Sequence, residues 1–98
     1  MPYQVSVFVE NKPGKIERIT RLLAGRQINI RAITIADAGD YGIMKFLLDN
    51  PVAGCEALTE AGIAASLKEI IAVRLADHPG SLADMAAILR DCGINVED

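Results

Sequence analysis

One pattern of turn and apolar residues occurs twice in the chain, at a fixed offset of 66 residues. Each copy has alternating apolar residues, a turn that ends in Pro-Gly, apolar residues at helical spacing, and the triplet Ile-Asn-Ile or Ile-Asn-Val. One such turn is a weak signal, because Pro and Gly are common in turns. Two of them with the same apolar spacing indicate an internal repeat. The matched residues are Val7, Val9, Asn11, Pro13, Gly14, Ile16, Ile19, Leu22, Leu23, Ile28, Asn29 and Ile30 in the first copy and Val73, Leu75, Asp77, Pro79, Gly80, Leu82, Met85, Ile88, Leu89, Ile94, Asn95 and Val96 in the second.

The repeat changes the domain organisation that the length alone predicts. A chain of 98 residues would ordinarily form one domain. The offset instead predicts a first module at residues 1–68 and the first, β-α-β half of a second module at residues 69–98. A fragment of about 30 residues is shorter than the roughly 40 that fold without a disulfide or metal. We therefore expect further sequence, to about residue 132 by the same period, or a neighbouring chain to complete the second module.

The beginning of the first module reads as a strand followed by a helix. Apolar residues alternate from Tyr3 to Val9, which is the period of a half-buried strand, and Phe8 falls on the opposite face. The turn Asn11-Lys12-Pro13-Gly14 ends this strand and precedes a helix that closes near Gly25. The apolar stripe of that helix is Ile16, Ile19, Leu22 and Leu23.

The rest of the module reads as two strands, a helix and a final strand. Residues 28–36 form a strand whose apolar residues change phase, which indicates either a bulge or burial on both faces. A turn at 37–40 leads into a strand at 41–48. Asn50 as N-cap and Pro51 begin a helix that closes at Gly62. The inward residues of this helix are expected to be Val52, Cys55 and Leu58, and extended sequence follows from Leu67 to Leu75.

This order of elements predicts the fold class. The fold is α+β, a ferredoxin-like β-α-β-β-α-β sandwich with a four-stranded antiparallel sheet and two helices on one face, followed by a partial second copy. The second copy repeats the strand end, the turn, the helix and the start of a strand at Ile94 and Val96.

The charge distribution argues against a nucleic-acid partner. The formal net charge is -3, divided into +4 for residues 1–31 and -7 for residues 32–98. A duplex-binding protein would carry a basic footprint, which this chain lacks. RNA-recognition modules share the order of elements, but they stack bases on sheet aromatics, and the third strand offers only Tyr41, Phe46 and one lysine. An acylphosphatase of this fold would need an arginine-bearing glycine loop after the first strand, and the turn at 11–14 is not one.

The chain has no apolar run near the roughly 18 residues that span a bilayer, and its first residues are not a secretory signal, so we expect no membrane partner and a cytoplasmic location.

Cys55 and Cys92 match no metal or redox spacing and are expected to be reduced thiols that pack as small hydrophobes. His78 is the only histidine, and the spacing supplies it with neither a metal set nor a nucleophile and base. We therefore expect no metal, no cofactor and no catalysis.

The repeated turns and the Ile-Asn-Ile and Ile-Asn-Val triplets resemble those of tandem ACT domains, the small-molecule-sensing modules attached to enzymes of amino-acid metabolism. The first copy is similar to the modules of acetolactate synthase regulatory subunits and of phosphoglycerate dehydrogenase. The resemblance implies a non-enzymatic regulatory role, with a ligand bound where the first strand's turn meets the first helix, between paired modules. It also implies a regulated enzyme or transcription factor as partner. Over the two copies, the implied ligand-binding residues are Asn11, Lys12, Pro13, Gly14, Lys15, Ile16, Asn29, Asp77, His78, Pro79, Gly80, Ser81 and Asn95.

The chemistry of the turn supports that location independently. Gly14 allows a ligand to approach the backbone, and the unpaired amides of Lys15, Ile16 and Glu17 at the helix N-terminus attract a carboxylate. Asn11 can accept from an ammonium or donate to a carboxylate, so the turn suits an amino-acid zwitterion. Asp77 replaces it in the second copy and can only accept, so the two sites are expected to differ. The alternative is that Asn11 and Asp77 only shape their turns.

Two surfaces remain open to more than one interpretation. The cationic side chains that lie off the apolar stripe of the first helix either attract an anionic partner or form a solvated face. Phe8 marks an apolar open face of the sheet, and the second strand is expected at a free sheet edge. Both features favour pairing between modules, as a homodimer or a higher oligomer. The runner-up function is an interaction module that binds no ligand and works through this face. The cationic residues are Lys15, Arg18, Arg21 and Arg26.

Overall fold

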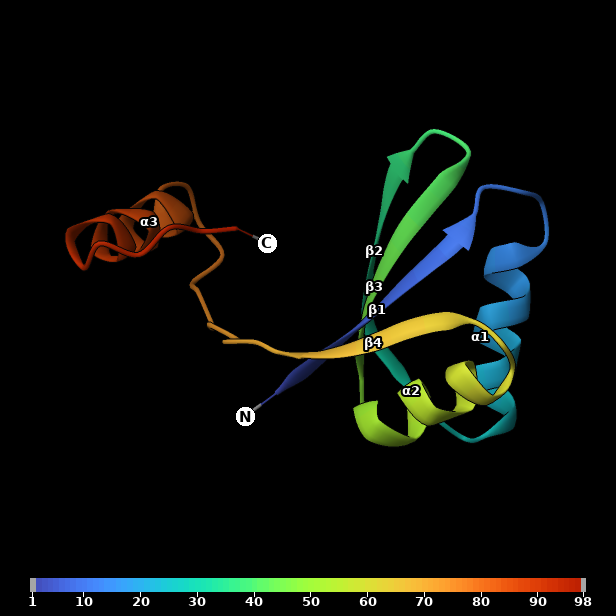
Figure 1. The fold of residues 1–98 in the computed structure, drawn as a ribbon. Helices are drawn as coiled ribbons and strands as arrows, with labels where there is room; N and C mark the ends of the chain where they lie inside the picture. The colour runs from blue at the N-terminus through green and yellow to red at the C-terminus, as the bar shows by residue number, and fades with distance from the viewer. Residues whose placement is uncertain (1, 98) are drawn as a thin grey trace.

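The computed structural model describes residues 2–97. Four strands and two helices follow one another in the predicted ferredoxin-like order, and a third helix follows after a linker (Figure 1). The sheet is antiparallel throughout, with the strand order β2-β3-β1-β4. The elements are β1 (Tyr3–Glu10), α1 (Lys15–Gly25), β2 (Ile30–Ala38), β3 (Tyr41–Leu48), α2 (Pro51–Glu60), β4 (Ala64–Glu69) and α3 (Ser81–Asp91).

The core lies between the sheet and one layer of helices. The alternation predicted for β1 is confirmed, because Val5 and Val7 are fully buried while Phe8 is 51% exposed on the opposite face. Val7 lies opposite Met44 of β3, and Phe46 of β3 lies opposite Val5, so the two central strands form the floor of the core. Burying side chains of this size contributes about 1.5–3 kcal/mol each. The other core residues are Ile19, Leu23, Ile28, Leu48, Ala57 and Leu58.

Both α1 and α2 cover the same face of the sheet (Figure 1). The N-cap predicted for α2 is confirmed, since the Asn50 side chain accepts a hydrogen bond from the Ala53 N–H at 3.2 Å. Two inward positions predicted for these helices are wrong: Ile16 and Val52 are both half exposed. Each is the second residue of its helix, in the first turn.

The predicted phase change in β2 is a bulge. Pairing with β3 shifts between Ile30 and Ala32, so one extra residue is inserted in β2. From Arg31 to Ala38 every residue of β2 is exposed, which excludes the alternative of a strand buried on both faces. The prediction of β2 as an edge strand is confirmed by the strand order.

The C-terminal part of the chain differs from expectation in three places. The final strand of the first module ends at Glu69, whereas the extended sequence was expected to continue to Leu75. No strand forms at Ile94 or Val96. Cys92 is exposed and packs in no core, while Cys55 is half-buried against the core as expected. The segments 70–75 and 92–96 differ from expectation for the same physical reason. Within residues 2–97, neither segment has a neighbouring strand to pair with or a helix layer to pack against.

The helix of the second copy does form. Like α1, α3 has 11 residues, and it begins 66 residues after α1. No side chain of α3 is buried, and Figure 1 shows it standing apart from the sheet and from α1 and α2. The structure therefore shows the repeated helix without a core around it, and the assignment of residues 69–98 as half of a second module remains a prediction.

Candidate ligand-binding site

The end of β1 and the start of α1 are joined by a short turn that the sequence determines locally. Gly14 has φ 85°, a left-handed conformation that glycine adopts at little cost, and it is the residue immediately before α1. The Arg18 N–H donates to the Gly14 carbonyl at 3.0 Å, which closes the first turn of the helix. Gly14 has open space around it, so a ligand can approach the backbone there.

Of the three backbone N–H groups expected to be unpaired at the start of α1, two lack a hydrogen-bond acceptor among the described residues. Lys15 was expected to have an unpaired N–H, but it donates to the Lys12 carbonyl at 3.3 Å. Within residues 2–97, the N–H groups of Ile16 and Glu17 have no hydrogen-bond acceptor. These two donors, together with the positive end of the helix dipole, favour an anion.

Asn11 connects this turn to the β2–β3 hairpin. Its side-chain N–H donates to the Gly39 carbonyl at 3.2 Å, and its backbone N–H donates to the Asp40 carbonyl at 2.8 Å. Asn11 therefore does shape the turn, as the alternative interpretation required. Its side-chain oxygen has no donor among the described residues and is left as an acceptor.

Glu10 and Lys12 form an exposed ion pair beside the turn, with 2.9 Å between the Oε2 and Nζ atoms. The hydrogen bond from Lys12 and the positive charges of Lys12 and Lys15 lower the pKa of the Glu10 carboxyl. The same hydrogen bond and the Glu10 charge raise the pKa of the Lys12 ammonium. Glu10 is therefore an anion at neutral pH, at the point where β1 ends.

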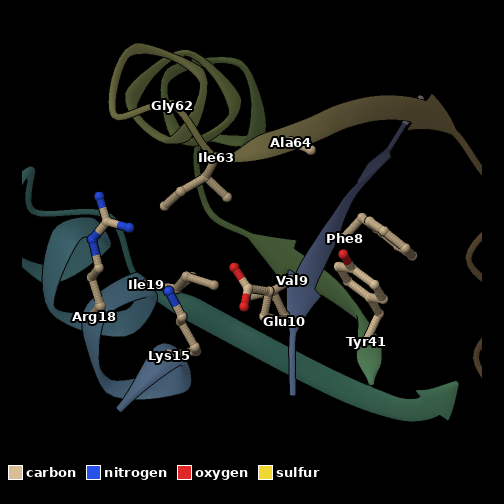
Figure 2. A pocket seen from close by; sticks show the side chains of 10 residues that line it. All are labelled: Phe8, Val9, Glu10, Lys15, Arg18, Ile19, Tyr41, Gly62, Ile63 and Ala64. Carbon is tan, nitrogen blue, oxygen red and sulfur yellow. The ribbon is translucent and has the colours of Figure 1, made fainter. Parts of the chain in front are cut away.

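A cleft of about 290 Å³ opens between the end of β1, the first two turns of α1 and the loop that leads into β4. Lys15 and Arg18 extend into it from α1, and Glu10 faces them from β1 (Figure 2). The cleft thus carries two cations and one anion over an apolar base formed by Val9, Ile19 and Ile63.

An aromatic pair lies beside the cleft, on the open face of the sheet (Figure 2). The rings of Phe8 and Tyr41 are stacked, with centroids 4.8 Å apart and planes at 12°. Both rings line the cleft mouth and both are about half exposed. The open apolar face predicted from the position of Phe8 therefore carries a stacked, half-exposed aromatic pair.

Sequence reasoning missed most of the cleft. Arg18 had been interpreted as part of either a solvated or an anion-attracting face; it lines the cleft and also donates to the Ala61 carbonyl at 3.4 Å. Its spacing of three residues from Lys15 was the available signal, because such residues share one side of a helix. Gly62 and Ile63 come from the loop before β4, 44 and 45 residues after Arg18 in the sequence. No local pattern could have placed them in the cleft.

The structure does not bring all of the predicted residues together. Asn29 lies at the far end of α1, where its N–H donates to the Asp49 Oδ1 at 3.0 Å. The turn at Asp77–Gly80 lies on the separate α3 side of the molecule (Figure 1). His78 and Ser81 are within hydrogen-bond distance of each other there, at 3.1 Å. Asn95 lines a different hollow of about 540 Å³, together with Gln4 and Val73.

The two turns nevertheless have the same backbone geometry. Gly80 has φ 92° and accepts from the Asp84 N–H at 2.9 Å, as Gly14 does from Arg18. Ser81 donates to the His78 carbonyl at 3.3 Å, the counterpart of the bond from Lys15 to Lys12. Among residues 2–97, no three His, Cys, Asp or Glu side chains are grouped so that they could hold a metal ion. No helix in this part of the chain is long and apolar enough to cross a membrane.

The model of the ACT domain pair family matches residues 2–97. The chain belongs to this family. The solved structure of protein BT0572 from Bacteroides thetaiotaomicron is similar to it, with a TM-score of 0.94 and 30% identity over 99% of this chain and 67% of that one. The comparison with curated proteins gave no match.

Two regulatory subunits of aspartate kinase are also similar to this ACT chain. The Thermus thermophilus subunit, solved in its ligand-free form, has a TM-score of 0.72 and 25% identity over 99% of this chain and 74% of that one. The Thermus flavus subunit has a TM-score of 0.70 and 26% identity over 98% of this chain and 73% of that one. The family expected from the repeated turns and the ferredoxin-like fold expected from the order of strands and helices are therefore confirmed.

Proposed function

We propose that this chain is a regulatory module that binds a free α-amino acid at the β1–α1 turn and in the adjoining cleft, and passes the resulting change in packing to an enzyme. The observation that carries the proposal is the cleft itself. Charges of both signs lie around an apolar base, and the helix that supplies Lys15 and Arg18 begins with two free amides. A zwitterion with a side chain needs this combination of groups.

The carboxylate of the ligand is proposed to bind on the α1 side. Lys15 and Arg18 supply positive charge there, and the free N–H groups of Ile16 and Glu17 supply two further donors. Charge-assisted hydrogen bonds of this kind are about twice as strong as neutral ones. Arg18 is exposed, so solvent and salt weaken its share of the attraction.

The ammonium of the ligand is proposed to bind on the β1 side. The Glu10 carboxylate is the anion there, and the side-chain oxygen of Asn11 is an acceptor without a donor among the described residues. The ligand's side chain would then contact Val9 and Ile63. In the second turn Asp77 stands in place of Asn11, and its carboxylate repels a ligand carboxylate, so the two turns are proposed to differ in ligand or occupancy.

The partner is proposed to be an enzyme of amino-acid metabolism in the cytoplasm. Two similar structures are described as regulatory subunits of aspartate kinase, which supports a regulated enzyme as partner. The exposed sheet face and the free strand edge support pairing between modules, as a homodimer or a higher oligomer. A regulatory effect requires that the ligand bind two packing states with different affinities.

A thermal-shift panel of the twenty amino acids tests the proposal. A ligand present at 100 times its dissociation constant adds about 2.7 kcal/mol to stability, which raises the Tm of a domain of this size by several degrees. We expect one amino acid, or a small chemical group of them, to raise the Tm. The absence of any shift at millimolar concentrations would contradict ligand binding.

Two arginines of α1 provide a matched pair of variants. Arg18→Gln removes a cation from the cleft and is expected to reduce the shift, with a loss of affinity of about tenfold, the range of one hydrogen bond to a charged group. Arg21→Gln removes a cation that lies outside the cleft and, among residues 2–97, pairs only with Glu17, so it should leave the shift unchanged. Equal effects of both variants would place the ligand elsewhere.

The runner-up function, an interaction module that binds no ligand, is favoured by a specific observation. The stacked Phe8 and Tyr41 rings leave an aromatic surface about half exposed on the open face of the sheet. Exposed aromatic surface of this kind is typical of protein interfaces. If no amino acid binds while Phe8→Ser abolishes association with the partner enzyme, this second function is the correct one.

A further inference from the structure

Within the described part of the chain, Arg18 lines the cleft without a carboxylate partner. The two arginines that follow it in sequence are both paired. Arg21 lies 3.8 Å from Glu17, measured between the Nε and Oε1 atoms, and Arg26 lies 3.0 Å from Glu60. The charge of Arg18 therefore faces the cleft without an opposite charge from the described chain.

The other cation of the cleft, Lys15, has an anion near it. The hydrogen bond and the charge of Lys12 lower the pKa of the Glu10 carboxyl, and the charge of Lys15 lowers it further. Figure 2 shows the Lys15 side chain on the Glu10 side of the cleft and Arg18 on the side of Ile63. Glu10 therefore already serves two lysines, and the positive charge of Arg18 remains unbalanced.

A hydrogen bond keeps the Arg18 guanidinium at that side of the cleft. Its Nη2 atom donates to the Ala61 carbonyl, just after α2, at 3.4 Å. A guanidinium has several N–H donors in a planar fork, so most of them stay available. This fork matches the two oxygens of a carboxylate and binds them in parallel. Arg18 is therefore a carboxylate-binding group that lacks a carboxylate.

Lys15 and Arg18 are spaced so that each can bind a separate carboxylate. Side chains three residues apart on a helix have Cβ atoms about 5–6 Å apart. Between them and the loop before β4, Ile19 and Ile63 form the apolar base of the cleft. A short aliphatic chain with a carboxylate at each end would contact this base and reach both cations.

The balance of charges distinguishes between classes of amino acid. A neutral amino acid brings one carboxylate and one ammonium, which match Lys15 and Glu10 and leave Arg18 unbalanced. A basic amino acid brings a second cation close to Arg18 and is disfavoured by repulsion. An acidic amino acid brings two carboxylates and one ammonium, so each of the three charged groups of the cleft meets its opposite.

We propose that the ligand of this cleft is an α-amino acid with an acidic side chain, aspartate or glutamate. Arg18 binds the side-chain carboxylate, Lys15 the α-carboxylate and Glu10 the ammonium. This inference rests on the proposed function and deepens it, because the second cation of α1 receives a carboxylate of its own. Arg18 then determines which class of amino acid binds.

Calorimetric titration of the protein with glutamate and glutamine, and with aspartate and asparagine, tests the class. Each pair has nearly the same shape and differs by one negative charge. We expect the Kd of each acid to be about tenfold lower than that of its amide. Equal values, or tighter binding of any neutral amino acid, would overturn this inference and leave the proposed function standing. If no amino acid binds, both fail.

Variants of α1 assign the preference to one residue. Arg18→Gln should raise the Kd of glutamate about tenfold and leave that of glutamine nearly unchanged, so the two become similar. Arg18→Lys keeps the charge without the fork and should retain part of the preference. Arg21→Gln, outside the cleft, should keep the whole of it. A full preference in Arg18→Gln, with the variant folded by circular dichroism, would overturn the role of Arg18.

Lys15→Gln separates the two carboxylates. Glutamate and glutamine share the α-carboxylate, so this variant should weaken both to the same extent and keep the ratio of their Kd values. Loss of the ratio in Lys15→Gln together with its retention in Arg18→Gln would show that the assignment is wrong.

Two further probes distinguish an amino acid from other anions. Glutarate has both carboxylates and no ammonium, so it should bind more weakly than glutamate. Inorganic phosphate at the same ionic strength should not displace glutamate. Added salt should reduce the preference for the acids, because Arg18 is exposed. If glutarate binds as tightly as glutamate, or phosphate displaces it, the cleft is a general anion site and the inference is wrong.

Discussion

Gly14 and Gly80 lie 66 residues apart and have nearly the same backbone conformation, with φ and ψ of 85° and -10° in the first and 92° and -16° in the second. Each precedes an 11-residue helix. The surroundings of the two helices differ completely: α1 buries Ile19 and Leu23, and α3 buries no side chain. The same local sequence therefore builds the same turn and helix whether or not a core forms around them.

The two glycines are expected to respond differently to the same substitution. Alanine in a left-handed conformation costs about 1–2 kcal/mol, and neither site has an atom near the added Cβ. Gly14→Ala should lower the free energy of unfolding of the first module by about that amount. Gly80→Ala should leave that transition unchanged, because α3 is not packed on the module. Urea titrations followed by circular dichroism measure both values, and an equal loss in the two variants would contradict the independence of α3.

The features that the sequence predicts well are those that depend on near neighbours in the chain. The Pro-Gly turns, the Asn50 cap and the bulge in β2 are determined by a few adjacent residues. The expected strand at 94–96 failed because a strand needs a partner, which lies outside any local pattern. Asn29 was misplaced relative to the turn because α1 separates them, and 11 residues of helix span about 16 Å.

The candidate site was predicted only in part for the same reason. The turn residues from Asn11 to Ile16 were found because they form a motif. The cleft forms because the loop before β4 lies next to α1. Ile63 therefore lines the cleft through tertiary packing alone. Arg18 had a local signal, its three-residue spacing from Lys15, but the same spacing fits a solvated helix face equally well.

Leu23 and Leu89 occupy equivalent positions in α1 and α3, and truncating each should have very different effects. Leu23 is fully buried, so Leu23→Ala is expected to cost about 2–5 kcal/mol from lost burial and the cavity left behind. Leu89 is only half-buried in the structure, and Leu89→Ala should cost less than about 1 kcal/mol. Unfolding in urea measures the difference. A comparable cost for both leucines would mean that α3 belongs to the same cooperative unit.

The Asn50 cap provides a prediction with a matched control. Its side-chain oxygen is the acceptor for the Ala53 N–H, so Asn50→Ala should destabilise the first module by about 1 kcal/mol, and Asn50→Asp should retain most of the stability. Asn29→Ala is the control, because within the described residues Asn29 forms hydrogen bonds through its backbone alone, with Asp49. Thermal unfolding followed at 222 nm measures all three. A loss in the control equal to that of Asn50→Ala would show that the cap is not the cause.

The Glu10–Lys12 ion pair makes stability depend on pH at the candidate site. Because the folded pKa of the Glu10 carboxyl lies below its unfolded value of 4.5, the folded state holds this proton less tightly than the unfolded state. The stabilisation from Glu10 is therefore complete above pH 4.5 and is lost as the pH falls through the folded pKa. The raised pKa of the Lys12 ammonium has the opposite sign, so its contribution is present below 10.5 and is lost as the pH rises above that value.

Glu10→Gln removes the titrating group and should flatten the acid side of the stability curve. We expect the difference in unfolding free energy between wild type and variant to be small at neutral pH, because both partners are exposed, and to vanish in acid. Added salt should reduce it further. Glu56→Gln, on the exposed side of α2, is the control and should leave the pH dependence as it is in the wild type. If Glu10→Gln keeps the full acid slope while Glu56→Gln removes it, the slope does not come from the Glu10–Lys12 pair.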